Sequence, residues 1–311
     1  MDLDLYKTLA GAIIGFVIGL TGMGGGALMT PVLVLLFGVS PGTAVSDDVV
    51  TSLVLKPFGG GVHIRRGTVN WRLVRWLMAG SMPAAFGGAY LLHRVVGEDN
   101  GPVIKRILGW VLIAAAAAII AKLVIQVRRK QATVTESMDP QLVRPLPTLA
   151  VGVLGGAIVG MTSVGSGSLM IVALMLMYPL LPCREMVGTD LVQAVPLVGA
   201  AALGHYLFGS LDISVIGSVL IGAVPAVIVG AHYSARGADH YIRPVLALIL
   251  VVSALGLLGV PNGWLLATTA AGLCILINLW VRTRHRLRSQ VVAPPAGPEY
   301  GEMASPAGDA H

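Results

Sequence analysis

Long apolar runs, separated by short charged or glycine-rich connections, set the pattern of this 311-residue chain. The runs cover residues 8–37, 43–63, 72–92, 104–127, 146–181, 185–208, 213–233, 243–258 and 262–281. Most are close to the roughly 20 residues that a helix needs to cross the hydrocarbon core of a bilayer. An outer-membrane barrel would instead show short strands of alternating apolar and polar residues. The pattern predicts an all-α integral membrane protein with eight or nine hydrophobic segments.

The first and fifth runs are too long for one straight crossing. A helix of about 30 residues measures about 45 Å, against about 30 Å of hydrocarbon. Each run contains a glycine cluster, at residues 19–26 and 160–167, and glycine permits irregular backbone and close approach of other groups. Such backbone is tolerated in a membrane only inside protein or beside a cavity. We expect each run to break into two short helices, which leaves open a re-entrant hairpin or two full crossings.

The two halves of the chain also align with each other. The first run matches the fifth at an offset of 141 residues, and one inserted residue makes the offset 142 beyond it. The matched pairs are Gly15/Gly156, Gly19/Gly160, Thr21/Thr162, Asp48/Asp190, His63/His205, Gly67/Gly209, Asn70/Asp212, Gly80/Gly222, Pro83/Pro225 and Gly88/Gly230. This agreement predicts an internal duplication.

Equivalent connections of the two halves differ in charge. The connection at 64–75 carries four arginines, whereas its counterpart at 209–212 carries no lysine or arginine. The basic stretch at 128–130 likewise has an uncharged counterpart at 259–262. Cytoplasmic loops of membrane proteins carry the excess of lysine and arginine, so equivalent loops are expected on opposite sides. The sequence predicts two inverted-topology repeats, with about seven full crossings plus two broken or re-entrant helical hairpins.

Crossing parity and charge then give the organisation of the chain. The acidic N-terminus is expected outside and the basic C-terminal run in the cytoplasm. The predicted parts are a first transmembrane repeat at 1–127, a cytoplasmic connector at 128–145, a second inverted repeat at 146–258, an extra helix at 259–282 and a basic, then disordered, cytoplasmic tail at 283–311.

Composition supports a membrane protein and narrows the function classes. The chain is 55% hydrophobic and 12% charged, against about 25% charged residues in a soluble domain. The net charge of +6 lies mainly in connecting segments, so it reports topology rather than nucleic-acid binding. Cys183 and Cys274 form neither a disulfide framework nor a metal-ligand spacing. No metal and no cofactor is expected.

The two glycine clusters form the candidate binding site for an anion. Free N–H groups and hydroxyls at helix breaks can hold an anion, and helix N-termini carry about half a positive charge. Under the alternative interpretation, the small residues only permit close helix packing. The candidate substrate-binding residues are Thr21, Gly22, Gly24, Gly25, Gly26, Thr162, Ser163, Gly165, Ser166, Gly167 and Ser168, together with Lys56.

Lys56 lies deep in the second apolar run. A cation inside a membrane is costly and marks a functional site by default, here by attracting an anion. Alternatively the run is shifted, and Lys56 extends its ammonium group to the cytoplasmic surface. Its repeat counterpart is Val198, so any role of Lys56 is confined to one half.

Carboxylates and histidines recur at equivalent places. Asp48 and Asp190 are candidate coupling or site-organising groups, and the alternative is that they cap helix N-termini. Gln193 lies near Asp190 and favours a buried role for it. His63 and His205 are candidates for proton relay, because histidine titrates near neutrality, or for a structural role at helix ends.

Two further polar residues have a simpler interpretation. Asn70 and Asp212 precede apolar runs and are expected to cap the helices that follow.

Together these motifs resemble the sulfite exporter TauE/SafE family of membrane permeases, over roughly residues 8–282. The resemblance rests on residues 19–26 and their second copy, on Pro31, on the region of Asp48 and on Gly67. It implies a bacterial cytoplasmic (inner) membrane protein that transports small anions such as sulfite, sulfoacetate or related organosulfonates.

The sequence therefore predicts a secondary transporter, not an enzyme. It is expected to move a small anion, sulfite or an organosulfonate, by alternating access at a midplane site. The expected partners are this anion and the lipid bilayer, with protons as the candidate coupling ion and a homo-oligomer left open. An anion channel and, with less support, an intramembrane enzyme are the alternatives.

Overall fold

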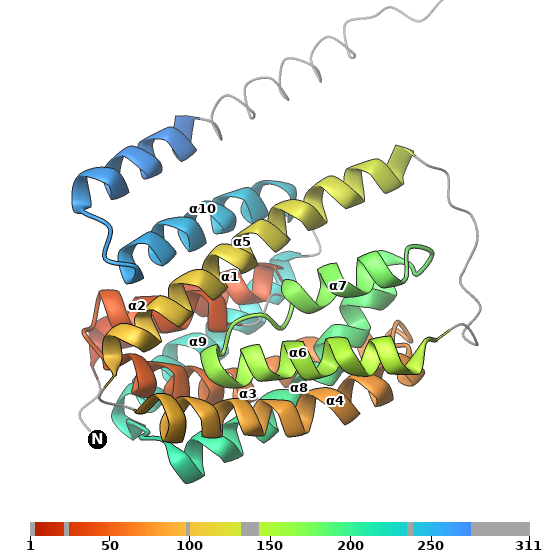
Figure 1. The fold of residues 1–311 in the computed structure, drawn as a ribbon. Coiled ribbons are helices and arrows are strands. Elements are labelled where there is room, and N and C mark those ends of the chain that lie inside the picture. Colours follow the sequence, from red (N-terminus) through yellow and green to blue (C-terminus); the bar gives the residue numbers. More distant parts are fainter. Residues whose placement is uncertain (1–3, 22–24, 98–99, 132–142, 235–238, 275–311) are drawn as a thin grey trace, which may run out of the picture. The chain divides into compact units, whose positions relative to one another are not determined.

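The computed structural model describes residues 4–21, 25–97, 100–131, 143–234 and 239–274. The chain divides into two compact units, residues 1–269 and 270–311, and the fold given below is that of the first unit. Its described residues form helices and connections and contain no strand (Figure 1). The predicted all-α class is confirmed for this part of the chain.

The helices follow the predicted apolar segments. The first half contains α1 (Leu5–Thr21), α2 (Gly26–Leu35), α3 (Pro41–Arg65), α4 (Trp71–Tyr90), the π-helical extension η1 (Leu91–Gly97) and α5 (Gly101–Gln131). The second half contains α6 (Pro145–Thr162), α7 (Leu169–Met177), α8 (Cys183–Phe208), α9 (Ile213–Ser234) and α10 (Asp239–Leu257). Residues 262–274 are also helical. Apart from η1, the two halves present the same order of helices within the described ranges.

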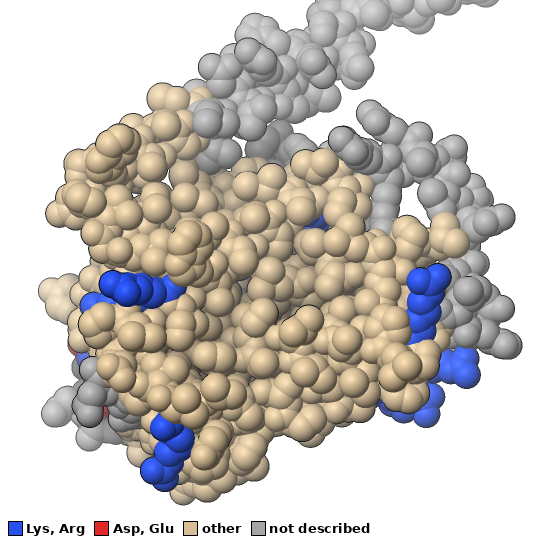
Figure 2. Space-filling view, in the orientation of Figure 1, with Lys and Arg blue, Asp and Glu red and all other residues tan. Residues whose placement is uncertain are grey.

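Four of the described helices are long and apolar enough to cross a membrane. They are Gly101–Gln126, Pro145–Thr162, Arg184–Phe208 and Ile213–Tyr233. α3 has 25 residues, but it contains Asp47, Asp48 and Lys56. The expected total of about seven crossings therefore stays a prediction. On the face shown in Figure 2, lysine and arginine gather near the edges and the area between them is mostly tan, as in a band that meets lipid.

Both long apolar runs are broken at the glycine clusters, as predicted. α1 ends at Thr21 and α2 begins at Gly26, whereas α6 ends at Thr162 and α7 begins at Leu169. α2 has 10 residues and α7 has 9, which corresponds to lengths of about 15 and 14 Å. These lengths are about half of the hydrocarbon thickness. They favour a re-entrant arrangement over two full crossings.

Each half packs its first helix against the other half. α1 lies along α9, and α6 lies along α4. A Cβ at Gly15 would be 2.5 Å from the Ala223 carbonyl oxygen, and a Cβ at Gly156 would be 2.4 Å from that of Ser81. The same correspondence holds for Gly11 with Val219 and Gly152 with Leu77, and for Gly19 with Val227 and Gly160 with Ala85. Close backbone packing therefore accounts for these glycines.

The direction of neighbouring helices follows from the same contacts. α1 and α9 run parallel, because successive glycines of α1 meet successive turns of α9. α3 and α8 run antiparallel, because Gly60 lies beside Leu191 while Gly199 lies beside Leu53. The equivalent helices α3 and α8 of the two halves thus point in opposite directions.

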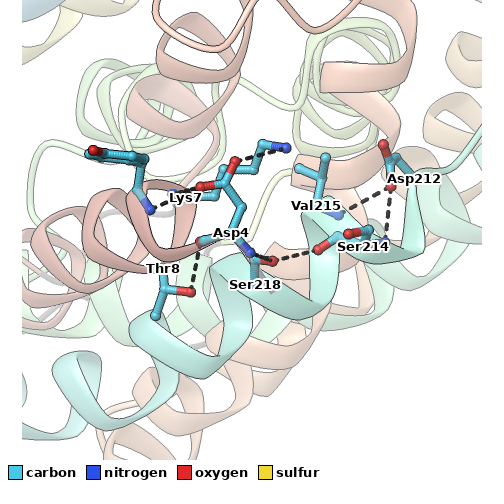
Figure 3. Close-up of polar contacts among 8 residues, drawn as sticks. Asp4, Lys7, Thr8, Asp212, Ser214, Val215 and Ser218 are labelled. Carbon is cyan, nitrogen blue, oxygen red and sulfur yellow. Dashed lines mark hydrogen bonds and ion pairs between the residues drawn. The ribbon is translucent and has the colours of Figure 1, made fainter. Parts of the chain in front are cut away.

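Asn70 and Asp212 cap the helices that follow them, which confirms the prediction. A backbone amide in the first turn of α4 donates to Asn70 Oδ1 at 3.2 Å, and Val215 N donates to Asp212 Oδ1 at 3.2 Å. Figure 3 shows Asp212 at the start of α9, beside the start of α1. There Asp4 N donates to Ser218 Oγ at 3.2 Å, so the residue before α1 is tied to the second turn of α9.

Candidate functional site

The two glycine-rich breaks contact each other. A Cβ at Gly26 would lie 1.8 Å from the Ser163 carbonyl oxygen, so only glycine fits at this approach. In the second break the φ angles are 59° at Ser163, 120° at Gly165 and 95° at Gly167, a region that favours glycine. Gly26 is the first residue of α2 and Gly25 is its N-cap. Gly22 and Gly24, also predicted to bind substrate, lie outside the described residues.

Lys56 is buried between the two breaks. Its side chain is 5% exposed, and its Nζ donates to Ser166 Oγ at 2.7 Å. Asp48 and Asp190 both attract its ammonium group. Lys56 lies about 22 Å along α3 from Pro41. The alternative of an ammonium group extended to the surface is therefore wrong, since the side chain points into the protein.

Asp48 accepts hydrogen bonds from two buried hydroxyls. Thr30 Oγ1, on α2, donates to Asp48 Oδ2, and Ser52 Oγ donates to Asp48 Oδ1 at 3.4 Å. The N-cap of α3 is Ser40, so the alternative that Asp48 caps this helix is wrong. Thr30 was not identified from the sequence, because a lone threonine in an apolar helix carries no signal.

Asp190 is held by a chain of amide and hydroxyl groups. Gln193 Nε2 donates to Asp190 Oδ1 at 3.1 Å, and Ser81 Oγ donates to Gln193 Oε1 at 3.2 Å. Asp190 Oδ2 is buried with no well-formed hydrogen bond in the described part of the chain, and the backbone N–H of Gly167 lies close enough to the carboxylate to stabilise its charge. The residue lies inside α8, whose N-cap is Pro182, so a capping role is wrong here too. The expected burial of Asp190 with Gln193 is confirmed.

A second buried cation lies near this group. Lys122 of α5 is 6% exposed and attracts the Asp190 carboxylate. Lys122 was not identified from the sequence, although it too is a lysine within an apolar run, the signal that singled out Lys56. The described site therefore combines two lysines with two carboxylates.

The hydroxyls of the two breaks have different partners. Thr21 Oγ1 donates to the Val17 carbonyl at 2.7 Å, and Thr162 Oγ1 donates to the Ile158 carbonyl at 2.6 Å. These two hydroxyl hydrogens are directed to their own helices. Ser163 Oγ, in contrast, is buried and makes no well-formed hydrogen bond among the described residues, and it lies close enough to the Asp48 carboxylate to stabilise its charge. Ser166 and Ser168 are buried in the same break, and none of the three serines lines the cavity beside Lys56.

A cavity of about 240 Å³ adjoins Lys56. It lies among α1, α3, α8, α9 and the first break. The lining residues are Ile18, Gly19, Gly25, Leu55, Lys56, Phe58, Gly59, Val62, Leu191, Val227, Ile228 and Ala231. Lys56 is the one charged residue in this lining. The cavity thus has an apolar wall, with Lys56 as its one charged residue.

The equivalent place in the other half is closed. His205 Nε2 lies 2.8 Å from the Gly160 carbonyl oxygen, and His205 Nδ1 lies 2.8 Å from His93 Nε2. A carbonyl oxygen only accepts, so His205 donates from Nε2, and in its neutral form it accepts at Nδ1. Ser46 Oγ lies 3.1 Å from His205 Nδ1. His93, on η1, was not identified because nothing in the sequence predicted a π-helical extension.

Equivalent residues show the contrast between the halves. Gly19 lines the cavity, whereas its counterpart Gly160 is buried under His205. Val62 is 41% exposed. Its counterpart Gly204 is closely packed, since a Cβ there would lie 2.7 Å from Ala89 Cβ. His63, the counterpart of His205, is partly buried and its Nδ1 lies 2.8 Å from Thr68 Oγ1. Thus the place beside Gly19, the open half of the site, is a cavity, and the equivalent place beside Gly160, the sealed half, is a closed contact. Helices of both repeats form each place.

Comparison with known proteins identifies relatives along most of the chain. The family model described as sulfite exporter TauE/SafE matches residues 8–257. A probable membrane transporter protein, YjnA of Bacillus subtilis (strain 168), is 37% identical over 252 residues, which cover 80% of this chain and 98% of that protein. YdhB of the same organism, also a probable membrane transporter protein, is 24% identical over 222 residues, 71% of this chain and 86% of its own. No solved structure matches significantly.

Proposed function

Because the chain belongs to the sulfite exporter TauE/SafE family of membrane transporters, we propose that it is a secondary transporter for a small anion, sulfite or an organosulfonate. The anion binds where the two glycine-rich breaks meet. Lys56 is the observation that carries this proposal, because it is buried, bonded to Ser166 of the second break and in contact with the cavity. A buried lysine beside a cavity provides the charge that an anion requires.

The charge balance around Lys56 supports a transported rather than a permanently bound anion. Asp48 and Asp190 attract the ammonium group when the site is empty, so the lysine is not left as an isolated charge in a medium of low dielectric constant. An arriving anion competes with these carboxylates for the ammonium group. Such competition limits affinity and permits release.

Alternating access is supported by the difference between the halves. In this mechanism one side of the site is open while the equivalent side is sealed. The cavity beside Gly19 and the His205–Gly160 contact are equivalent places in these two conditions. Exchange of the two local conformations would close the cavity and open the His205 side.

Inverted repeats are part of this proposal. The swapped pairing of α1 with α9 and α6 with α4, together with the antiparallel course of α3 and α8, supports them. The cavity lies toward the ends of α3 and α9, and α3 ends at Arg65. By the positive-inside rule this end faces the cytoplasm of a bacterial inner membrane, with the N-terminus outside.

Protons are the coupling ion that we propose. Asp190 Oδ2 is buried without a well-formed hydrogen bond among the described groups, and a proton on this oxygen would free Lys56 for the anion. An anion channel is the alternative. A carrier shows saturable counterflow of labelled substrate, whereas a channel does not.

The test is transport by purified protein in proteoliposomes loaded with sulfite or sulfoacetate. Lys56→Met is expected to abolish substrate-dependent uptake, because it removes the ammonium group that Asp48 and Asp190 both attract. Lys105→Met is the matched control, since Lys105 is exposed at the start of α5, and it should transport normally. Wild-type rates in a correctly inserted Lys56→Met protein would refute the proposed site.

A further inference from the structure

The cavity beside Lys56 is larger and more apolar than an inorganic oxyanion requires. Its volume is about 240 Å³, and a water molecule takes up about 30 Å³ of the liquid, so about eight groups of that size would fit. A sulfonate or carboxylate head accounts for three or four of these. Room for about four carbon atoms remains, and sulfite has no carbon atoms to fill it.

The wall of the cavity is suited to that remaining part. Leu55, Phe58, Leu191 and Val227 present aliphatic or aromatic surface to the cavity. An alkyl group placed against such surface leaves water, at a gain of about four-fold in affinity for each buried methylene. A second charged or strongly polar group on the ligand would lose its hydration there without a partner.

The charges around the cavity favour a single negative charge on the ligand. Lys56 is the only cation in the described lining, and Asp48 and Asp190 lie close enough to act on it. A dianion would place its second charge against the apolar part of the lining, because Lys122 acts on Asp190 and does not line the cavity. The cost of burying the second charge would not be repaid.

We propose that this cavity selects monoanions with a short apolar tail, namely alkanesulfonates or alkanecarboxylates of about four carbons, over sulfite and over dianions such as sulfoacetate. The ammonium group of Lys56 holds the head and the wall between α3 and α9 holds the tail. This inference rests on the proposed anion site and narrows its substrate class.

The experiment is isothermal titration of the purified protein in a non-ionic detergent. The ligands are methane-, propane-, butane-, hexane- and dodecanesulfonate, with sulfite and sulfoacetate alongside. The Kd should fall about four-fold per methylene up to about butanesulfonate, and then rise as the tail exceeds the cavity. Butanesulfonate should bind at least ten-fold more tightly than sulfite or sulfoacetate.

Gly59 offers a variant that shortens the preferred tail. A Cβ there would lie 3.7 Å from Leu191 Cδ2, which is ordinary contact, so a side chain fits and takes up part of the cavity. Gly59→Val should move the optimum toward methanesulfonate, and Gly59→Ala should do so to a smaller extent. Gly61→Val is the matched control, because a Cβ at Gly61 meets nothing within 4 Å and Gly61 does not line the cavity.

The outcomes separate this inference from the proposed function. Sulfite or sulfoacetate binding as tightly as butanesulfonate, with no effect of tail length, would overturn the inference and leave the anion transporter intact. Continued tightening through dodecanesulfonate would overturn the size limit and indicate a lipid-like occupant. Absence of binding by every anion in the series would overturn both.

Discussion

Removal of the His205 imidazole should unseal the closed half of the transporter. His205 bridges α8 to Gly160 at the end of α6 and also contacts His93. His205→Ala deletes both contacts and leaves the Gly160 carbonyl without its donor. Because the equivalent place in the other half is already open, the substitution should favour the conformation with the opposite side accessible.

The size of the effect follows from the lost hydrogen bond. One buried hydrogen bond contributes about 0.5–1.5 kcal/mol net, and an unsatisfied buried group costs about 1–3 kcal/mol. A loss of about 1.5–3 kcal/mol in one conformation shifts a two-state equilibrium about ten-fold to 150-fold. The accessibility to water of a side chain buried in the sealed half should increase by the same factor.

Cysteine labelling measures this accessibility. After replacement of Cys183 and Cys274 by serine, single cysteines are introduced as Ala201→Cys in the sealed half and Gly59→Cys in the cavity. Ala201 is 0% exposed, and Gly59, its repeat counterpart, lines the cavity. A small water-soluble thiol reagent in opened vesicles should modify Gly59→Cys rapidly and Ala201→Cys slowly. Addition of His205→Ala should accelerate labelling at position 201 at least ten-fold.

The equivalent histidine supplies the control. His63 contacts Thr68 and lies beside the half that is already open, so His63→Ala should not accelerate labelling at position 201. An unchanged labelling rate in a folded His205→Ala protein, or an equal increase with His63→Ala, would refute the proposed role of His205. Either result would mean that the His205–Gly160 contact does not hold the closed half.

Two further predictions concern packing and topology. Gly156→Ala should lower the free energy of unfolding by about 1–3 kcal/mol, because its Cβ would lie 2.4 Å from a backbone oxygen of α4. Gly87→Ala is the control and should not lower it, since a Cβ at Gly87 meets nothing within 4 Å. Thermal unfolding in detergent measures both variants. Arg66→Cys and Ser210→Cys should react with an impermeant reagent from opposite sides of oriented vesicles, and labelling from one side would contradict the inverted repeat.

Glycine spacing and the repeat made much of the fold predictable. The breaks at Thr21 and Thr162 followed from glycines inside runs too long for one crossing, and the caps at Asn70 and Asp212 followed from their position before apolar runs. These features depend on local backbone chemistry, which a single sequence displays. Lys56, Asp48 and Asp190 could also be identified, because charged side chains stand out within apolar runs.

The remaining features depend on tertiary contacts. His93 reaches His205 only because η1 extends α4 with a different helical period. Thr30 reaches Asp48 only because α2 folds back onto α3. The open and sealed halves carry equivalent residues in several places, so the repeat pattern predicts their likeness and not the difference between them. The difference between the open and the sealed half depends on the conformation of the whole molecule.

The swapped pairing of α1 with α9 also has a consequence for biosynthesis. α1 ends at Thr21 and α9 begins at Ile213, so the ribosome adds about 190 residues before the partner of α1 exists. At about 5–20 residues per second this takes about 10–40 s. During that interval the glycine face of α1 meets only lipid or the insertion machinery. α1 therefore stays in the membrane as a helix without its final partner until the second half has been made.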